Sequence, residues 1–192
     1  MHIIFASHNE HKVEEIQKRL SSFHELSSLR AMGWEQEIPE NGITLRENAL
    51  IKARTVYEEL GKPVLADDTG LEVDALEGAP GVYSARYAGL ERNSEANMEK
   101  LLTEMKWIDN RSARFRTCLA LIISGEAYIF EGIVEGKISH QRQGTGGFGY
   151  DPIFIPRGEE RSFAEMSLGE KNKISHRARA MGKLMDFLAK LT

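Results

Sequence analysis

Two adjacent carboxylates, Asp67 and Asp68, are the residues whose type and spacing are best suited to chemistry. They follow the apolar run of residues 64–66, which predicts a short buried strand, and the loops after such strands often build ligand sites. Two like charges this close raise each other's pKa unless a cation lies near them. A hard cation such as Mg²⁺, bound by the carboxylates and by phosphate oxygens, would relieve the repulsion and activate a water molecule. The alternative is a solvated turn in which one Asp caps backbone amides.

The sequence SHNEHK, residues 7–12, supplies polar groups that suit a phosphate. It follows an apolar run at residues 2–6, which predicts a buried strand, and precedes apolar residues at helical spacing over residues 13–20. Strand, polar loop and helix in this order aim the helix N-terminal amides at an anion, and Lys12 adds a positive charge. The Walker pattern GxxxxGK[ST] is absent, and an ordinary helix cap with a surface lysine is equally compatible with the loop.

A glycine-rich loop, GTGGFGYDP at residues 144–152, is the third candidate. Glycine allows a backbone to bend sharply or to approach another group closely. Phe148 could stack on a nucleobase, and Asp151 could accept a hydrogen bond from a ring N–H. Phe148 and Tyr150 are equally compatible with the hydrophobic core, so the loop predicts either a base pocket or a core segment.

Basic residues cluster within SLGEKNKISHRARA, residues 167–180. They are Lys171, Lys173, His176, Arg177 and Arg179. We expect one helix from about residue 174 to residue 191, with the cluster near its start. Cations there oppose the helix dipole, which favours a role facing an anion over a merely solvated helix start. His176 and Arg177 could also donate hydrogen bonds to a carbonyl oxygen.

The elements that would position these residues alternate between strand and helix. A capping box at residues 44–47 starts a helix that Gly61 ends. A further helix is predicted over residues 93–105. Residues 113–124 and 126–138 predict two long strands joined by a hairpin turn.

Residues 1–192 are therefore expected to form one α/β domain: a central mixed, twisted sheet flanked by helices, in two lobes with a ligand cleft between them. Hydrophobic residues make up 41%, enough for a core, and the formal net charge of -4 argues against a protein that coats nucleic acid. Cys118 is the only cysteine, which excludes an intramolecular disulfide and a cysteine zinc site. Without a signal peptide or a membrane-length apolar run, we expect a cytoplasmic protein that binds neither nucleic acid nor membranes.

Taken together and in this order, the motifs resemble those of the inosine triphosphate pyrophosphatase family. The resemblance extends from about residue 2 to about residue 190, through SHNEHK, ENALIKA, LADDTGLEVDALEGAPGVYSARYAG, GTGGFGYDPIF and EMSLGEKNKISHRARA. It implies an elongated α/β fold with a cleft between two lobes, assembled as a homodimer. It also implies Mg²⁺-dependent hydrolysis of ITP, dITP and XTP to the monophosphate and pyrophosphate, which clears deaminated purines from the nucleotide pool.

The resemblance further implies a role for each matching residue. Asp68 would be the general base and a metal ligand, with Asp67 and Glu40 completing the metal shell. The triphosphate would be bound by Ser7, His8, Asn9, Glu10, His11 and Lys12, with its charge neutralised by Lys52 and Lys171. The nucleoside would be bound by Thr69, by Phe148 stacking on the base, by Gly149, Tyr150 and Asp151 around the pocket, and by His176 and Arg177 at the 6-keto group. His8 stands where the family commonly has glycine, so its side chain is expected to narrow the phosphate loop or to add a contact.

Such a pocket would separate purines by their hydrogen-bonding edge. A 6-keto purine presents an acceptor at C6 and a protonated N1, whereas adenine presents an amino donor and an unprotonated N1. A donor from His176 or Arg177 would leave buried groups unpaired against adenine, which can disfavour it by about 10⁴-fold. Guanine shares the keto edge and must be rejected at its 2-amino group, and no residue of the sequence identifies that filter.

Three other functions are compatible with parts of the sequence. An aspartyl phosphotransferase would use DDTG at residues 67–70, but the D-x-D-x-T spacing is absent and such an enzyme would release phosphate. A nucleotide sensor would keep the pocket without turnover and would not need an acidic cluster. A nucleic-acid-binding protein would need a basic surface and a recognisable module, and the net charge of -4 and the lack of such a module argue against it.

Overall fold

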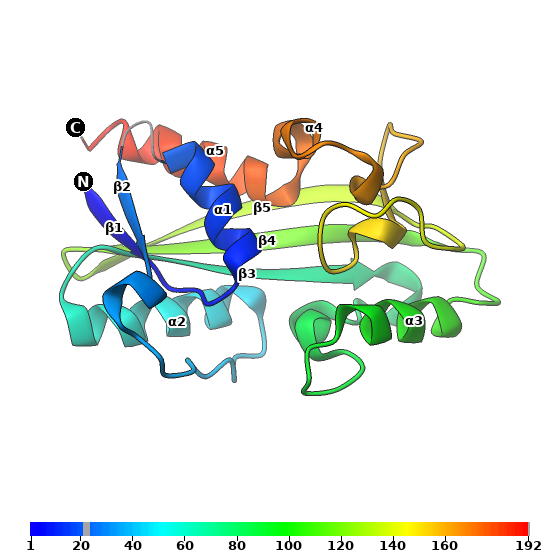
Figure 1. The fold of residues 1–192 in the computed structure, drawn as a ribbon, viewed down its shortest axis with the longest axis horizontal. Helices are drawn as coiled ribbons and strands as arrows, with labels where there is room; N and C mark the ends of the chain where they lie inside the picture. Colours follow the sequence, from blue (N-terminus) through cyan, green and yellow to red (C-terminus); the bar gives the residue numbers. More distant parts are fainter. Residues whose placement is uncertain (21–23, 192) are drawn as a thin grey trace. The chain divides into compact units, whose positions relative to one another are not determined.

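A mixed six-stranded sheet is the framework of the protein, with the strand order β2-β1-β3-β4-β5-β6 (Figure 1). The computed structural model describes residues 1–20 and 24–191. The strands are β1 (His2–Phe5), β2 (Glu25–Ser28), β3 (Val64–Val73), β4 (Ser112–Ile123), β5 (Glu126–Ile138) and β6 (Phe154–Pro156). The α-helices are α1 (Glu10–Leu20), α2 (Leu45–Leu60), α3 (Ser94–Glu104), α4 (Leu168–Ile174) and α5 (His176–Leu188). Strand β1 pairs in parallel with β2 and β3, whereas β5 pairs antiparallel with β6, so the predicted mixed α/β sheet is confirmed.

The chain divides into two compact units, and three strands contribute residues to both. Unit 1 comprises Met1–Asp68, Thr117–Gly132 and Arg179–Thr192, and unit 2 comprises Thr69–Arg116 and Ile133–Ala178. The boundary therefore falls within β3, between Asp68 and Thr69. Two lobes were predicted from the sequence, and the ligand cleft between them stays a prediction.

In unit 1, helices cover both faces of the sheet. Helices α1 and α5 lie on one side of β1 and β3, and α2 lies on the other side (Figure 1). The core beneath α1 and α5 includes Phe5 of β1, Leu65 of β3, Ile16 of α1 and Leu184 of α5, all fully buried. The apolar stripes that predicted α1 and α5 are thus the faces that these helices turn to the sheet.

Helix α2 forms where the sequence predicted it. Its cap is Thr44, whose Oγ1 accepts a hydrogen bond from the Glu47 N–H at 3.1 Å. The Glu47 carboxylate reaches back one residue further than a capping box requires, and accepts a hydrogen bond from the Ile43 N–H at 2.8 Å. The buried face of α2 is mostly apolar, but it also contains two buried polar residues, Asn48 and Lys52.

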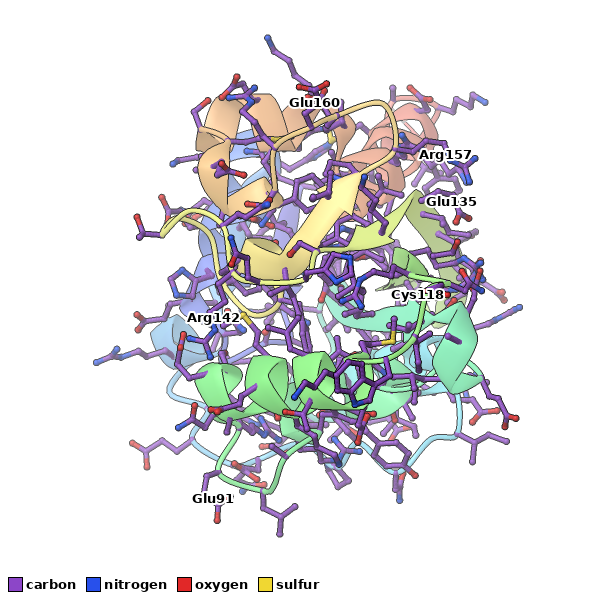
Figure 2. The ribbon with its side chains drawn as sticks, turned by 90° about the vertical axis from the view of Figure 1, so that its right-hand side faces the viewer. Glu91, Cys118, Glu135, Arg142, Arg157 and Glu160 are labelled. Carbon is purple, nitrogen blue, oxygen red and sulfur yellow. The ribbon has the colours of Figure 1, made fainter. Side chains whose placement is uncertain are left out.

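In unit 2, aromatic rings form the centre of the core. Phe115 of β4 packs edge-on against Phe154 of β6, with ring centroids 4.7 Å apart, and lies 6.2 Å from Phe163. The apolar face of α3 joins the same cluster. Arg142 precedes the glycine-rich loop and lies beside α3, where its Nη2 donates to the backbone carbonyl of Glu95 at 3.1 Å (Figure 2). The loop is therefore tied to this helix.

Several element boundaries differ from the sequence-based prediction. Strand β3 continues to Val73, so the two adjacent carboxylates lie within a strand and not in a loop after it. Helix α1 begins at Glu10, which limits the polar loop to residues 7–9. Strands β2 and β6 were not predicted, because with 4 and 3 residues they are too short to show an alternating pattern.

The C-terminal helix predicted over residues 174–191 is α5, and a separate helix, α4, which was not predicted, precedes it. Ser175, with an extended backbone, separates α4 from α5. Lys171 and Lys173 lie in the last turn of α4, where the helix dipole favours cations. The argument that the dipole opposes these two lysines was therefore wrong. It remains valid for His176 and Arg177, which begin α5.

Candidate functional site

Strand alternation places Asp67 and Asp68 on opposite faces of β3. Successive side chains of a strand point to opposite faces of the sheet. Asp67 shares its face with Leu65, beneath α1, and contacts Lys12 of that helix. Asp68 points toward α2 and accepts a hydrogen bond from Lys52 Nζ at 2.9 Å. Each carboxylate thus has its own lysine, and no shared cation is needed to relieve repulsion between them.

The Asp67–Lys12 ion pair fixes a positive charge at the start of α1. The Asp67 carboxylate is fully buried, whereas the Lys12 side chain is 15% exposed. Asn9 Oδ1 accepts a hydrogen bond from the Lys12 N–H at 3.2 Å, and Ser7 Oγ accepts one from the Asn9 N–H at 3.2 Å. An ammonium group and backbone amides therefore lie at one helix N-terminus, the arrangement that binds phosphate groups.

The other residues of SHNEHK expose their side chains. Glu10 pairs with Arg30 at 3.1 Å, and both side chains are largely exposed. His8 Nε2 donates to the carbonyl oxygen of Gln36 at 3.1 Å. The histidine that replaces the family's usual glycine thus adds a contact with a second loop, one of the two effects expected for it. The side chain of His11 is exposed, and a phosphate role for it stays a prediction.

Lys52 joins two carboxylates on the α2 face of β3. Its Nζ donates to Asp68 Oδ1 at 2.9 Å and to Glu40 Oε1 at 2.7 Å. Burial would lower the pKa of Lys52, but the two carboxylates outweigh burial and the pKa is raised, so the ammonium stays charged. Burial raises the pKa of Asp68, although Lys52 and Lys12 act in the opposite direction. The raised pKa makes Asp68 a stronger proton acceptor than an ordinary aspartate.

Glu40 and Asp68 form a set of oxygen ligands that fits a hard divalent cation. Asp68 Oδ2 is buried and has no hydrogen-bond partner in the described part of the chain. Mg²⁺ binds proteins through one or two carboxylates and completes its shell with water and substrate phosphates. Over residues 1–20 and 24–191, no three His, Cys, Asp or Glu side chains are grouped for a metal. The structure places Asp67, which was predicted as a third ligand, on the other face of β3, where it pairs with Lys12.

In unit 2, two cations lie beside the ring of Phe148. Lys171 Nζ is 4.6 Å from the ring centroid, and Arg177 Cζ is 5.7 Å from it. Arg177 Nη2 also donates to Thr69 Oγ1 at 3.2 Å. An aromatic ring beside fixed donors can stack on a base while the donors contact its edge. Thr69, Phe148 and Arg177 therefore lie together as predicted, and Lys171, which was assigned to the phosphates, lies with them.

Asp151 holds the glycine-rich loop in its conformation. Its Oδ2 accepts hydrogen bonds from the Phe148 N–H and from Lys171 Nζ, both at 2.8 Å. Gly147 has φ +70, and a Cβ there would lie 2.2 Å from Asp151 Oδ2, so this position requires glycine. The carboxylate thus positions Phe148. Its predicted contact with a ring N–H of the base stays a prediction.

Tyr150 and His176 are buried in the core of unit 2. The Tyr150 hydroxyl donates to the Ser84 carbonyl at 2.9 Å, and the His176 ring stacks on Phe115 with centroids 4.6 Å apart. Of the two interpretations that the sequence allowed for Tyr150, the core position is confirmed. Gly149, between Phe148 and Tyr150, has φ +61, a conformation that favours glycine. The contact of His176 with a 6-keto group stays a prediction.

Comparison with known proteins identifies the family. A family model described as the Ham1 family matches residues 3–187. The chain belongs to the Ham1 family. A dITP/XTP pyrophosphatase of Christiangramia forsetii is 53% identical over 190 residues, which cover 99% of this chain and 100% of that protein. The resemblance found in the sequence is thereby confirmed.

Solved structures of Ham1 proteins have the same fold. The Staphylococcus aureus Ham1 protein matches with a TM-score of 0.92 and 36% identity, covering 100% of both chains. A nucleoside-triphosphatase, named dITP/XTP pyrophosphatase, from Mycobacterium abscessus matches with a TM-score of 0.79 and 43% identity, covering 96% of this chain and 98% of that one. The predicted α/β fold class is confirmed by these matches.

Two residues that position Glu40 in this Ham1 protein, Gly42 and Asn48, were not predicted from the sequence. The Gly42 N–H donates to Asn48 Oδ1 at 2.8 Å, which ties the Glu40 loop to α2. A Cβ on Gly42 would lie 2.7 Å from Glu47 Cβ and 2.8 Å from Asn48 Oδ1, so only glycine fits without a shift. The available signal was the spacing of Asn48 and Lys52, which are four residues apart and therefore share one face of the helix. Polar residues on an otherwise apolar helix face indicate a site.

None of the helices that the structure describes is long and apolar enough to cross a membrane. The cytoplasmic location and the homodimer expected for this Ham1 protein stay predictions.

Proposed function

We propose that this Ham1 protein hydrolyses the deaminated purine nucleotides ITP, dITP and XTP to the monophosphate and pyrophosphate. Relatives named dITP/XTP pyrophosphatase support the proposal, since those from Christiangramia forsetii and Bacillus subtilis match 99% and 96% of this chain. The observation that carries it is the Glu40–Lys52–Asp68 cluster, in which a carboxylate with a raised pKa keeps one oxygen without a hydrogen-bond partner among the described residues. The physiological result would be the removal of deaminated purines from the nucleotide pool.

The residues of unit 1 would bind the polyphosphate and direct a water molecule. The Asp68 carboxylate would accept a proton from the water as the water oxygen attacks the α-phosphorus. Lys12, held by Asp67, would stabilise the pyrophosphate as the α–β anhydride bond breaks. One water is consumed, one P–O bond forms and one breaks. This chemistry depends on positioning and electrostatics, and it needs no covalent intermediate.

Glu40 and Asp68 would hold one Mg²⁺ ion. The bound ion would neutralise phosphate charge and lower the pKa of a bound water molecule. Glu40 fits this role because its side chain is 20% exposed, so that water and phosphate oxygens can reach its carboxylate. Asp68 fits it because its Oδ2 has no hydrogen-bond partner in the described structure. Asn48 would support the site from α2 by holding the Glu40 loop.

The residues of unit 2 would bind the base. Phe148 would stack on the purine, and Arg177 or His176 would donate to the 6-keto oxygen. The positive charge of Lys171 and Arg177 beside the Phe148 ring favours a carbonyl oxygen over the amino group of adenine. A site built for a hydrogen-bond acceptor can reject an analogue that lacks it by about 10⁴-fold.

Product analysis tests the proposal. Pyrophosphate and phosphate released from ITP, dITP, XTP, GTP and ATP are measured with Mg²⁺ and with a chelator. We expect Mg²⁺-dependent pyrophosphate from the first three nucleotides and little from GTP or ATP. Phosphate as the product would place the attack at the γ-phosphorus and contradict the mechanism. Tight binding of ITP without turnover would favour a nucleotide sensor.

A further inference from the structure

Lys52 contacts the same two carboxylates that would hold the metal ion. Its Nζ lies 2.7 Å from Glu40 Oε1 and 2.9 Å from Asp68 Oδ1, and the residue is only 6% exposed. An Mg²⁺ ion takes carboxylate oxygens at about 2.0–2.1 Å and demands near-octahedral geometry. A metal ion bound to the same two oxygens would lie close to the ammonium group, and the repulsion between their like charges disfavours both cations at these distances.

The charge of the cluster makes the exchange of cations favourable. With two carboxylates and one ammonium group, the cluster carries one net negative charge. A divalent ion in place of the ammonium group would neutralise the two carboxylates better than Lys52 does. Glu40, whose side chain is 20% exposed, provides a first contact for an entering ion. Asp68 Oδ2, which has no hydrogen-bond partner among the described residues, provides the next while Oδ1 still accepts from Lys52. The metal can therefore begin to bind before the lysine leaves.

The backbone around the cluster is held independently of Lys52. Asn48 fixes the Glu40 loop through the Gly42 N–H, and Lys52 itself lies in the middle of α2 between the buried residues Ala49 and Val56. Only the lysine stem, with its freely rotating bonds and its compact ammonium group, is suited to move. Release of Lys52 would thus change the position of one side chain and leave the ligand positions in place.

We propose that Lys52 is a built-in counter-cation of the metal site. In the metal-free protein it keeps Glu40 and Asp68 together, and it gives up at least one of them when Mg²⁺ binds. The freed ammonium group is then available for the phosphate oxygens of the nucleotide, a step that rests on the function proposed above. Lys52 would in this way couple metal binding to substrate binding, beyond merely neutralising phosphate charge.

Lysine reactivity in the wild-type protein tests the release directly. Reductive methylation with formaldehyde, quantified for each lysine by mass spectrometry, is compared without metal, with Mg²⁺ alone, and with Mg²⁺ plus α,β-methylene-ITP. We expect Lys52 to be protected without metal, several-fold more reactive with Mg²⁺, and protected again with the nucleotide analogue. Lys62, which is exposed just beyond the same helix, is the internal control and should react equally in all three states.

Metal binding by a variant provides the second measurement. Lys52→Met keeps the stem but removes the charge, and Lys62→Met is the matched control. By calorimetry without nucleotide, we expect Lys52→Met to bind Mg²⁺ at least about tenfold more tightly than wild type, the scale on which neighbours of metal ligands change affinity. Its unfolding temperature should be lower than that of wild type without metal, and Mg²⁺ should raise it by more. Lys62→Met should match wild type in each respect.

The outcomes separate this inference from the proposed function. Lys52 reactivity that Mg²⁺ leaves unchanged, or weaker Mg²⁺ binding by Lys52→Met, would overturn the counter-cation role while ITP hydrolysis by the wild type still supports the function. Wild-type protein that binds no Mg²⁺ would overturn both the counter-cation role and the metal site. Hydrolysis of ITP is assayed separately, so its absence would count against the function alone. If Lys52→Met does not fold, the reactivity of wild-type Lys52 decides the question.

Discussion

The Asp67–Lys12 ion pair allows a direct test of whether each of the two adjacent carboxylates has its own lysine partner. Removing one member of a buried pair generally costs about 3–5 kcal/mol, because the other charge is left without compensation. Lys12 is 15% exposed, so its freed ammonium group can reach water. We therefore expect a coupling free energy between Asp67 and Lys12 of about 2–3 kcal/mol, below that range. A surface pair would give about 0–1 kcal/mol. Asp67 and Lys52 lie on opposite sides of β3 and should show almost no coupling.

Two double-mutant cycles measure these couplings by urea unfolding without metal. The first combines Asp67→Asn with Lys12→Met, and the second combines Asp67→Asn with Lys52→Met. Because residues without shared partners are usually additive to within about 0.5 kcal/mol, the second cycle is the control for the first. A coupling below about 0.5 kcal/mol in the first cycle, or equal couplings in the two cycles, would refute the assignment of one lysine to each carboxylate.

Four further predictions follow from the site. Asp68→Asn should lower turnover of ITP by about 10²–10⁴-fold, the usual contribution of a general base, and near-normal turnover would remove Asp68 from the mechanism. Because burial raises the pKa of Asp68, its favourable contribution to stability is full below the ordinary Asp pKa and is lost as the pH rises through the raised value. Without metal, the unfolding temperature of Asp68→Asn should therefore rise relative to that of wild type as the pH increases above the ordinary Asp pKa, and a constant difference would contradict this sign. Phe148→Ala should raise the KM for ITP by about tenfold or more, as the loss of a stacked base implies, and an unchanged KM would exclude stacking. His8→Gly removes an exposed hydrogen bond to Gln36, and it should change the KM for ITP by less than about tenfold; a larger loss would give His8 a direct role in phosphate binding.

Local patterns in the sequence predicted the elements that carry the site. The capping residues of α2, the two long strands β4 and β5 and the start of α3 lie where capping, alternation and turn signals placed them. These features depend on neighbours within a few residues, which the sequence shows directly. The identity of most of the candidate site residues followed from the order of the motifs along the chain.

The partners of the charged residues could not be predicted in the same way. Asp67 and Asp68 were expected to share a cation in a loop, because the sequence does not show that β3 continues through them and turns their side chains to opposite faces. Their lysines come from α1 and α2, at distances of 55 and 16 residues along the chain, and no local pattern connects such positions. The same holds for Lys171, whose partner Asp151 lies 20 residues away and draws it to the ring of Phe148.

The isotopic fate of the attacking water tests the central claim most directly, namely that Asp68 directs water to the α-phosphorus. Wild-type protein hydrolyses ITP with Mg²⁺ in ¹⁸O-labelled water, and the products are separated and examined by mass spectrometry. The account predicts one ¹⁸O atom in the phosphate of the nucleoside monophosphate and none in the pyrophosphate. Label in the pyrophosphate, or in free phosphate, would place the attack at another phosphorus and contradict the proposed mechanism.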